Sequence, residues 1–144
     1  MRILPDTSVL VAAMVNAHPA HGRALPWLQR IRAGTVTGIV AAHSIAETYA
    51  VLTRLPVQPR ITPHLAYQVI LHNVLQICTI IALTPDDYRQ IVADLAGAGL
   101  AGGVTYDVPA VYTAKQALVD QIVTLNVKDF RRIYPNLQAN IVEP

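Results

Sequence analysis

The sequence predicts an α/β fold, a three-layer sandwich in which helices flank a central, mostly parallel β-sheet. The main observation is an alternation of short apolar or β-branched runs with longer stretches whose apolar residues recur at helical spacing. Strands that alternate with helices form parallel sheets covered on both faces. The length of 144 residues and the apolar fraction of 53% fit one packed core, and no linker or repeat interrupts the chain. We therefore expect residues 1–144 to form a single domain.

The first half of the chain is predicted to contain two strands and four helical segments. In chain order they are a strand at 1–6, a helix or helical turn at 8–15, a helix at 20–33, a strand at 35–41, and helices at 44–56 and 62–76. Ser44 is the expected N-cap of the third helix and Pro56 its end, whereas Thr62 and Pro63 begin the fourth. Pro5 lacks the N–H that a strand ladder uses, so we expect the first strand to end early or to contain a bulge there.

The second half continues the alternation. It is predicted to contain a strand at 78–83, a helix at 84–99, a glycine-rich loop at 96–103, a helix from 107 to about 118, a strand at 121–126, a short turn or helix at 128–134 and a possible last strand at 139–144. The Thr-Pro-Asp-Asp start at residue 84 is typical of a helix N-terminus, because its hydroxyl and acids satisfy the free N–H groups of the first turn.

Composition limits the function classes. No stretch approaches the ~20 apolar residues that span a membrane, and Pro5 and Asp6 interrupt the short run that resembles a secretory signal. The single Cys78 is expected to be a buried, reduced thiol. We therefore expect a soluble, cytoplasmic protein with no membrane partner. The net charge of +2 is too small to establish a nucleic-acid partner, although nine of the eleven basic residues are arginine, which suits phosphate recognition.

Four of the nine acidic residues lie where strands end or on a helix near the core. In open parallel sheets, ligands bind beyond the carboxyl ends of the strands. Asp6 follows the first strand, Asp129 follows the strand at 121–126, and Asp107 begins the helix before that strand. Glu47 lies on the third helix. The remaining acids are expected to be solvated: Asp86, Asp87, Asp94, Asp120 and Glu143.

Each of these four acids also has a purely structural explanation. Asp6 could form a turn or cap, Asp107 could cap its own helix, and Asp129 could be an exposed turn residue. Glu47 could pair with His43 one helical turn earlier. Individually, therefore, none of the four establishes a site.

Convergence of the four carboxylates would require protons or a divalent cation. Two carboxylates ~4 Å apart repel by about 4 kcal/mol at an effective dielectric constant of roughly 20. Hard oxygen ligands suit Mg²⁺ or Mn²⁺, and His18 and His21 have no third partner for a zinc site. Carboxylate-held cations support the attack of water on phosphodiesters, so the pattern predicts phosphodiester hydrolysis.

Four segments resemble those of PIN domains in order and spacing: DTSVLVA, AHSIAETYAVLTRLP, TYDVPAVYTAKQ and IVTLNVKDF. The resemblance runs from Arg2 to about Asn140 and is strongest to the bacterial toxin branch, the VapC-like ribonucleases. It implies a PIN-like fold and a Mg²⁺- or Mn²⁺-dependent endoribonuclease that cuts single-stranded or looped RNA. It also implies a homodimer that a small antitoxin protein silences by inserting its tail into an acidic groove.

The resemblance further implies roles for individual residues. The catalytic acids would be Asp6, Glu47, Asp107 and Asp129, and the metal ligands would be Asp6, Asp107 and Asp129. Asn126 is a neutral neighbour that could share the fourth position. Thr7 and Ser8 resemble the hydroxyl pair that supports the first acid, and Thr124 would have a similar part.

RNA contacts follow from the same mechanism as further expectations. Arg54, Arg131 and Arg132 are candidate phosphate contacts, with solvated surface charge as the alternative. Tyr106 or Trp27 could stack on a base, although both are expected to pack in the core.

Two alternatives share the fold: a PIN nuclease of RNA processing that has no antitoxin, and a catalytically silent PIN-like module that only binds RNA or protein. Retention of all four acids argues against the silent module. A receiver-type phosphorylation domain is discarded, because its acidic pair near the amino terminus is absent and neither Lys115 nor Lys128 fills its lysine position.

Overall fold

The fold is a parallel sheet between two layers of helices, as predicted. The computed structural model describes residues 1–144, apart from the side chains of residues 138 and 139. Five strands form one sheet in the order β3-β2-β1-β4-β5, and each neighbouring pair is parallel. The strands are β1 (Arg2–Pro5), β2 (Thr37–Ala41), β3 (Cys78–Ile81), β4 (Gln121–Val123) and β5 (Ile141–Val142).

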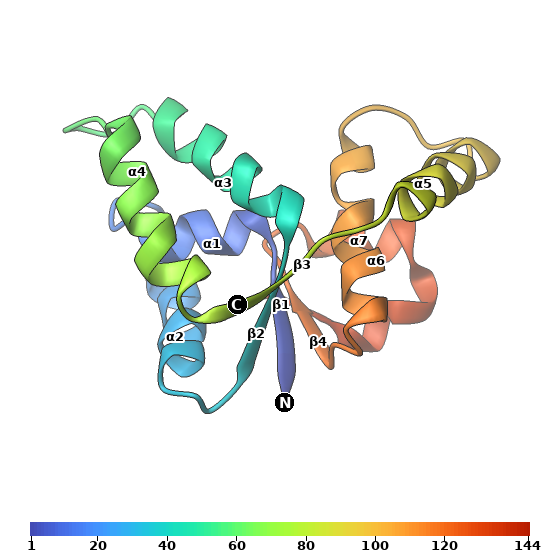
Figure 1. Cartoon of the computed structure of the whole chain (residues 1–144), viewed down its shortest axis with the longest axis horizontal. Coiled ribbons are helices and arrows are strands. Elements are labelled where there is room, and N and C mark those ends of the chain that lie inside the picture. The colour runs from blue at the N-terminus through green and yellow to red at the C-terminus, as the bar shows by residue number, and fades with distance from the viewer.

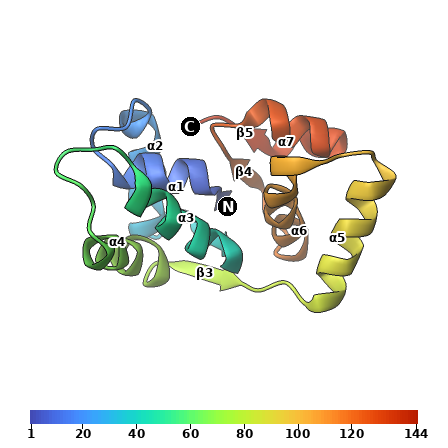
Figure 2. The same ribbon diagram turned by 90° about the horizontal axis from the view of Figure 1, so that it is seen from above.

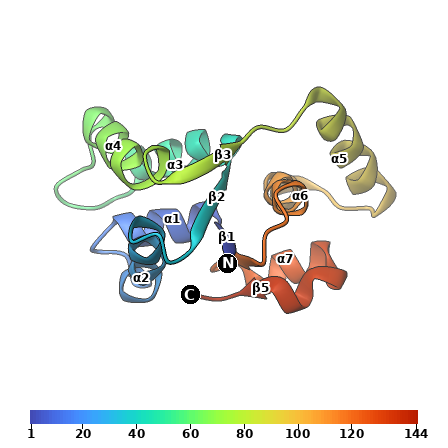
Figure 3. The same cartoon turned by 60° about the horizontal axis from the view of Figure 1, so that its bottom comes forward.

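Helices cover both faces of the sheet. One layer contains α1 (Thr7–Met14), α2 (His21–Arg32), α3 (Ala42–Arg54), α4 (Pro63–Ile70) and the π-helical turn η1 (Leu71–Leu75). The other contains α5 (Pro85–Gly97), the 3-10 turn η2 (Gly102–Tyr106), α6 (Val108–Gln116), α7 (Val127–Ile133) and the 3-10 turn η3 (Pro135–Asn140). Figure 1 shows the two layers on either side of the strands, and the views in Figures 2 and 3 agree. The predicted α/β three-layer architecture is therefore confirmed.

The three inner strands β2, β1 and β4 are apolar beyond their first residues because both of their faces are buried there. Ile3 of β1 packs into a core formed with α1, α2, α3 and α4, whereas the next residue, Leu4, packs against α6 and α7. Adjacent strand residues point to opposite faces, so this change of core within two residues follows directly from strand geometry. No helix in the part of the chain that the structure describes is long and apolar enough to cross a membrane.

The strand order creates a switch point between β1 and β4. From β1 the chain moves outward through β2 to β3, then returns to the other side of β1 and continues through β4 to β5. Connections therefore leave the carboxyl ends of β1 and β4 in opposite directions. In sheets of this type a ligand site forms in the crevice at that point.

Pro5 does not disturb the first strand, so the expected early end or bulge is wrong. Pro5 pairs with Val123 of β4 in unbroken register, and the next N–H, that of Asp6, donates to the Val123 carbonyl at 3.0 Å. Pairing of β1 with β2 ends at Ile3 and Gly38. Because the ladder to β2 has already ended, it requires no N–H from Pro5.

Capping residues in the sequence predicted the starts of α4 and α5 correctly and the start of α3 incorrectly. The Thr62 hydroxyl caps α4 and accepts from the Leu65 N–H at 3.2 Å, and Thr84 forms a reciprocal capping box with Asp87. The predicted cap at Ser44 is wrong. Helix α3 begins at Ala42, directly after β2, and Ser44 is buried inside it.

Polar and aromatic contacts hold α6 in place. The Tyr112 hydroxyl of α6 donates to Asp94 of α5, which was expected to be merely solvated. The Tyr112 ring meets the edge of Tyr134 at a centroid distance of 6.4 Å, and the Lys115 ammonium lies 4.2 Å from the Tyr134 centroid. These contacts fix the position of α6, the helix that begins directly after Asp107.

Candidate active site

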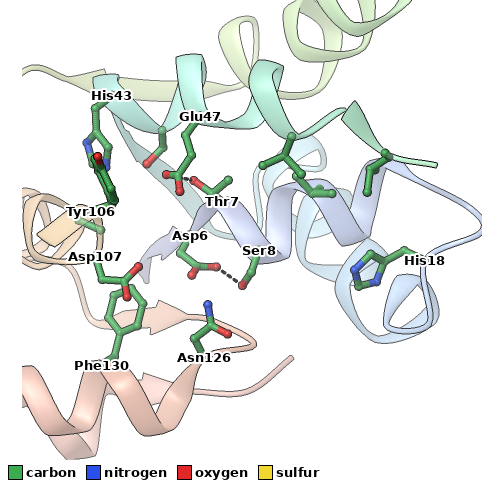
Figure 4. A pocket seen from close by; sticks show the side chains of 15 residues that line it. Asp6, Thr7, Ser8, His18, His43, Glu47, Tyr106, Asp107, Asn126 and Phe130 are labelled. Carbon is green, nitrogen blue, oxygen red and sulfur yellow. Dashed lines mark hydrogen bonds between the residues drawn. The ribbon is translucent and has the colours of Figure 1, made fainter. Parts of the chain in front are cut away.

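A pocket of about 280 Å³ lies at the switch point of the sheet. Its wall combines the end of β1, helix α3, the start of α6 and the segment that follows β4. Asp6, Glu47, Asp107 and Asn126 all line it. Figure 4 shows these four side chains around the same space, although they come from distant parts of the sequence. The structure thus brings together three of the four acids selected from the sequence.

Asp6 is buried and held by three hydrogen bonds. Its Oδ1 accepts from the Ser8 hydroxyl at 2.6 Å and from the Val9 N–H at 3.1 Å, and its Oδ2 accepts from the Thr124 hydroxyl at 2.8 Å. The bond from Val9 makes Asp6 the N-cap of α1, so the capping explanation holds alongside its place in the pocket. Burial raises the pKa of Asp6 even though the hydrogen bonds lower it, and the charge of Glu47 adds to the increase.

The hydroxyls that hold Asp6 are themselves held by the chain that follows β4. The Leu125 N–H donates to the Ser8 hydroxyl at 3.0 Å, and the Asn126 N–H donates to the Thr124 hydroxyl at 2.9 Å. These bonds explain why β4 ends at Val123 rather than at the predicted residue 126. The Thr124 N–H still donates to the Val142 carbonyl of β5 at 3.0 Å, but the next two N–H groups bond to site side chains instead of a neighbouring strand.

Glu47 is oriented by Thr7, which corrects the expected role of that hydroxyl. The Thr7 hydroxyl donates to Glu47 Oε2 at 2.8 Å, whereas we expected it to support Asp6. The oxygens of Asp6 already accept from other groups, and Thr7 on α1 faces the neighbouring α3. Thr7, which directly follows Asp6 in the sequence, therefore positions Glu47 beside Asp6.

Asp107 does not cap the helix that it begins. Its side chain makes no capping bond to α6, so the structural explanation offered by the sequence fails. Burial, followed by the charges of Asp6, Glu47 and Asp129 in that order, raises the pKa of Asp107 to about 6. The carboxylates are thus close enough to oppose one another's ionisation, which is the electrostatic condition for a cation site.

Asp129 lies outside the pocket wall, and Asn126 lies in it. The side chain of Asp129 is 52% exposed, and its Oδ1 is 3.8 Å from the guanidinium of Arg132 in the same helix. Its charge nevertheless reaches Asp107. The sequence left the fourth position open between these two residues, and the geometry favours Asn126 as the lining group.

The three arginines proposed as RNA contacts are exposed and do not line the pocket. Arg54 is exposed on α3 and borders a shallow depression of about 450 Å³ together with Glu47. The Arg131 guanidinium donates to the Ile141 carbonyl at 3.4 Å, and Arg132 pairs with Asp129. All three remain accessible to an anion that approaches the pocket.

Two residues named from the sequence without being placed in the site, His43 and Tyr106, also line the pocket. His43 lies one turn before Glu47 on the same helix, and this i, i+4 spacing could have identified it. Burial lowers the pKa of His43 more than Glu47 and the Tyr106 backbone raise it, so the ring is neutral at neutral pH. Tyr106 is 66% exposed at the pocket, contrary to the expected packing in the core. Trp27 does pack partly against the core of α1 and α2.

The donor set fits a hard divalent cation. Asp6, Glu47 and Asp107 offer carboxylate oxygens, and Asn126 offers an amide oxygen. The pKa of Asp107 is raised first by burial and then by the neighbouring negative charges, which a cation would offset. Among the residues whose side chains the structure describes, no three His, Cys, Asp or Glu side chains gather closely enough to hold one ion between them. The acids therefore surround the pocket rather than converge on one point.

The raised pKa of Asp107 predicts a pH-dependent loss of stability in the metal-free protein. The folded state retains this proton up to about pH 6, whereas the unfolded chain releases it near 3.8, so stability falls between those values as pH rises. We expect the free energy of unfolding of Asp107→Asn minus that of the wild type to increase from pH 4 to pH 6 and then level off. Urea unfolding in the presence of a chelator measures it. A difference that does not change with pH would contradict the assignment.

Comparison with known proteins identifies the family. The sequence profile described as PIN domain matches residues 3–134. Ribonuclease VapC40 of Mycobacterium tuberculosis is 40% identical over 119 residues, which cover 80% of each chain. This chain therefore belongs to the PIN-domain family, and the resemblance predicted from the sequence is confirmed.

Solved structures agree in fold. VapC20 of Mycobacterium tuberculosis, described as a sarcin-ricin loop cleaving toxin, has a TM-score of 0.64 and 17% identity, covering 83% of this chain and 86% of its own. VapBC2 of Rickettsia felis, bound to a DNA fragment from its promoter, has a TM-score of 0.67 and 19% identity, covering 100% and 99%. At these identities the likeness concerns the fold.

Proposed function

We propose that this protein is an endoribonuclease that depends on Mg²⁺ or Mn²⁺ and serves as the toxin of a toxin–antitoxin pair. The observation that carries the proposal is the placement of Asp6, Glu47 and Asp107 around one pocket at the switch point. The charges of Asp6 and Glu47 there help to raise the pKa of Asp107, and the charge of Glu47 helps to raise the pKa of Asp6. Membership in the PIN-domain family and the 40% identity to a ribonuclease support the same activity.

The proposed metal ligands are Asp6 and Asp107, completed by Asn126 or by Asp129. Asp6 is already fixed by Ser8, Val9 and Thr124, so the adjustment needed to close around an ion falls to Asp107, whose side chain makes no capping bond. A bound divalent cation would supply a lowered pKa for water and stabilisation of the charge that develops on a phosphodiester.

The protein's own groups then have distinct parts. Thr7 holds Glu47 with one carboxylate oxygen bonded, so Glu47 is oriented to accept a proton or to complete the ligand set. The hydroxyls of Ser8 and Thr124 keep Asp6 in a single orientation. Arg54, Arg131 and Arg132 would attract the flanking phosphates of an RNA strand.

The assembly of the protein is part of the proposal. A small antitoxin protein is the proposed partner, the chain is proposed to form a homodimer, and the cytoplasm is its proposed location. We also propose that residues 1–144 form one domain. The VapBC2 structure matches this chain over its whole length, which supports an assembly of similar kind.

RNA cleavage in defined metal conditions tests the proposal. The protein is incubated with a pool of RNA hairpins of varied loop sequence in Mg²⁺ or Mn²⁺, with and without excess chelator, beside Glu47→Gln. We expect cleavage that stops with the chelator and falls about 10²–10³-fold in the variant, the usual effect of losing one charge-stabilising group. Cleavage that persists in the chelator would refute metal dependence. Cleavage without toxicity on expression would instead favour an RNA-processing nuclease that has no antitoxin.

A further inference from the structure

Tyr106 is an aromatic residue whose exposure its own fold does not explain. Its side chain is 66% exposed, yet it lines the acidic pocket, and Figure 4 places it beside His43 at the end of the pocket away from His18. Phe130, the other ring in the wall, is completely buried. Other tyrosines are exposed as well, but Tyr106 is the most exposed of them and lines the acidic pocket, so its ring is available to a ligand bound there.

A hydrogen bond fixes the backbone at Tyr106, whereas its ring is exposed to solvent. Tyr106 ends the 3-10 turn η2, and the following Asp107 N–H donates to the Val104 carbonyl at 3.1 Å. His43 of α3 and Tyr106 line the same end of the pocket, and the Tyr106 backbone acts to raise the pKa of His43, so α3 lies beside this turn.

The position of Tyr106 is set by its covalent bond to Asp107. Neighbouring Cα atoms are ~3.8 Å apart and both residues line the pocket, so a phosphodiester bound through a cation at the Asp107 carboxylate would have a flanking nucleotide within reach of the Tyr106 ring. Aromatic rings bind unpaired bases by stacking, and they do so with little regard to base identity. A paired base cannot offer its face in this way, because its neighbours in the duplex already cover it.

We propose that Tyr106 is the base-stacking residue of the site, and that it binds an unpaired base next to the phosphate to be cut. This inference rests on the proposed ribonuclease function and adds to it a residue that makes the site prefer single-stranded or looped RNA. A protein partner could also cover an exposed ring. The adjacency of this ring to a catalytic carboxylate favours the nucleotide.

Steady-state kinetics on one hairpin that the wild-type protein cleaves tests the inference. We compare Tyr106→Ala and Tyr106→Phe with Tyr88→Ala, a control at a tyrosine 41% exposed on α5 that does not line the pocket. Loss of one stacked base weakens binding on the order of tenfold, so we expect KM to rise by about that factor in Tyr106→Ala. Tyr106→Phe and Tyr88→Ala should keep the wild-type KM.

An abasic substrate separates stacking from a structural role. The same hairpin is made without the base on either side of the cut phosphate, and the effect of Tyr106→Ala should then disappear. An equal loss on the intact and abasic hairpins, or no loss on either, overturns the inference. An unchanged KM with weakened neutralisation by the antitoxin assigns the ring to a protein partner and also overturns it.

A failure of the ribonuclease proposal is distinguishable from a failure of this inference. If the wild-type protein cleaves no hairpin, the proposed function fails, and the role of Tyr106 is decided by fluorescence anisotropy with a labelled hairpin in chelator. Weaker binding by Tyr106→Ala than by Tyr106→Phe supports stacking in that case. Equal binding by the two variants refutes it.

Discussion

Replacing Asp107 by Asn is expected to make the protein more stable and nearly inactive. The variant removes a carboxylate whose pKa is raised to about 6 by burial and by the charges of three other acids. Full retention of that shift would correspond to about 3 kcal/mol, since one unit is 1.36 kcal/mol. Because the carboxylate is partly exposed and therefore screened by solvent, we expect a gain of about 1–2 kcal/mol in the metal-free protein at pH 7.

The same substitution should lower RNA cleavage by about 10²–10³-fold, as expected for a lost charge at the reacting centre. Opposite changes in stability and activity are the mark of a residue retained for function. Asp86→Asn is the matched control, because Asp86 is exposed on α5 and pairs only with Arg89 at 2.7 Å. It should leave both quantities nearly unchanged. An Asp107→Asn protein that is less stable than the wild type would contradict the electrostatic account.

Substitutions of Asp6 should separate its contribution to stability from its contribution to RNA cleavage. Asp6→Ala removes the cap of α1 and leaves the buried Thr124 hydroxyl without its acceptor, so we expect a loss of about 2–4 kcal/mol. Asp6→Asn keeps an oxygen for Ser8 and Val9 and removes the buried charge. It should therefore be as stable as the wild type, or more so.

Both Asp6 variants should lose cleavage by about 10²–10³-fold, because neither offers a carboxylate to a cation. Urea unfolding and a cleavage assay on the same preparations measure the two effects. If Asp6→Asn remained active, the residue would be a helix cap only. If Asp6→Ala were as stable as the wild type, the hydrogen-bond network around it would contribute nothing to the fold.

The fold was predictable because its signals are local. Alternating strand and helix patterns indicated the parallel sheet, and the caps at Thr62 and Thr84 lie next to the helices that they begin. The errors concern tertiary context. Ser44 has a capping residue type, but α3 starts directly from β2 and passes through it. Pro5 has no N–H, but the strand order places it where the ladder to β2 has ended.

The candidate site was predictable in its acids but not in their partners. Their places at element ends selected Asp6, Asp107 and Asp129, and a place on a helix near the core selected Glu47. The resemblance then implied their roles. Which carboxylate Thr7 contacts depends on the packing of α1 against α3, which no local pattern encodes. The choice between Asn126 and Asp129 depends on the direction in which the short helix α7 leaves β4.

Dependence of cleavage on Mn²⁺ concentration tests the central claim most directly. The initial rate on one hairpin RNA is measured for the wild type and for Asp107→Asn, starting from protein treated with chelator. The account predicts no cleavage without the ion, a rate that rises to saturation with Mn²⁺ in the wild type, and almost none in the variant at the same concentrations. A wild-type rate that is independent of Mn²⁺ and survives the chelator, or an Asp107→Asn protein with the wild-type curve, would contradict it.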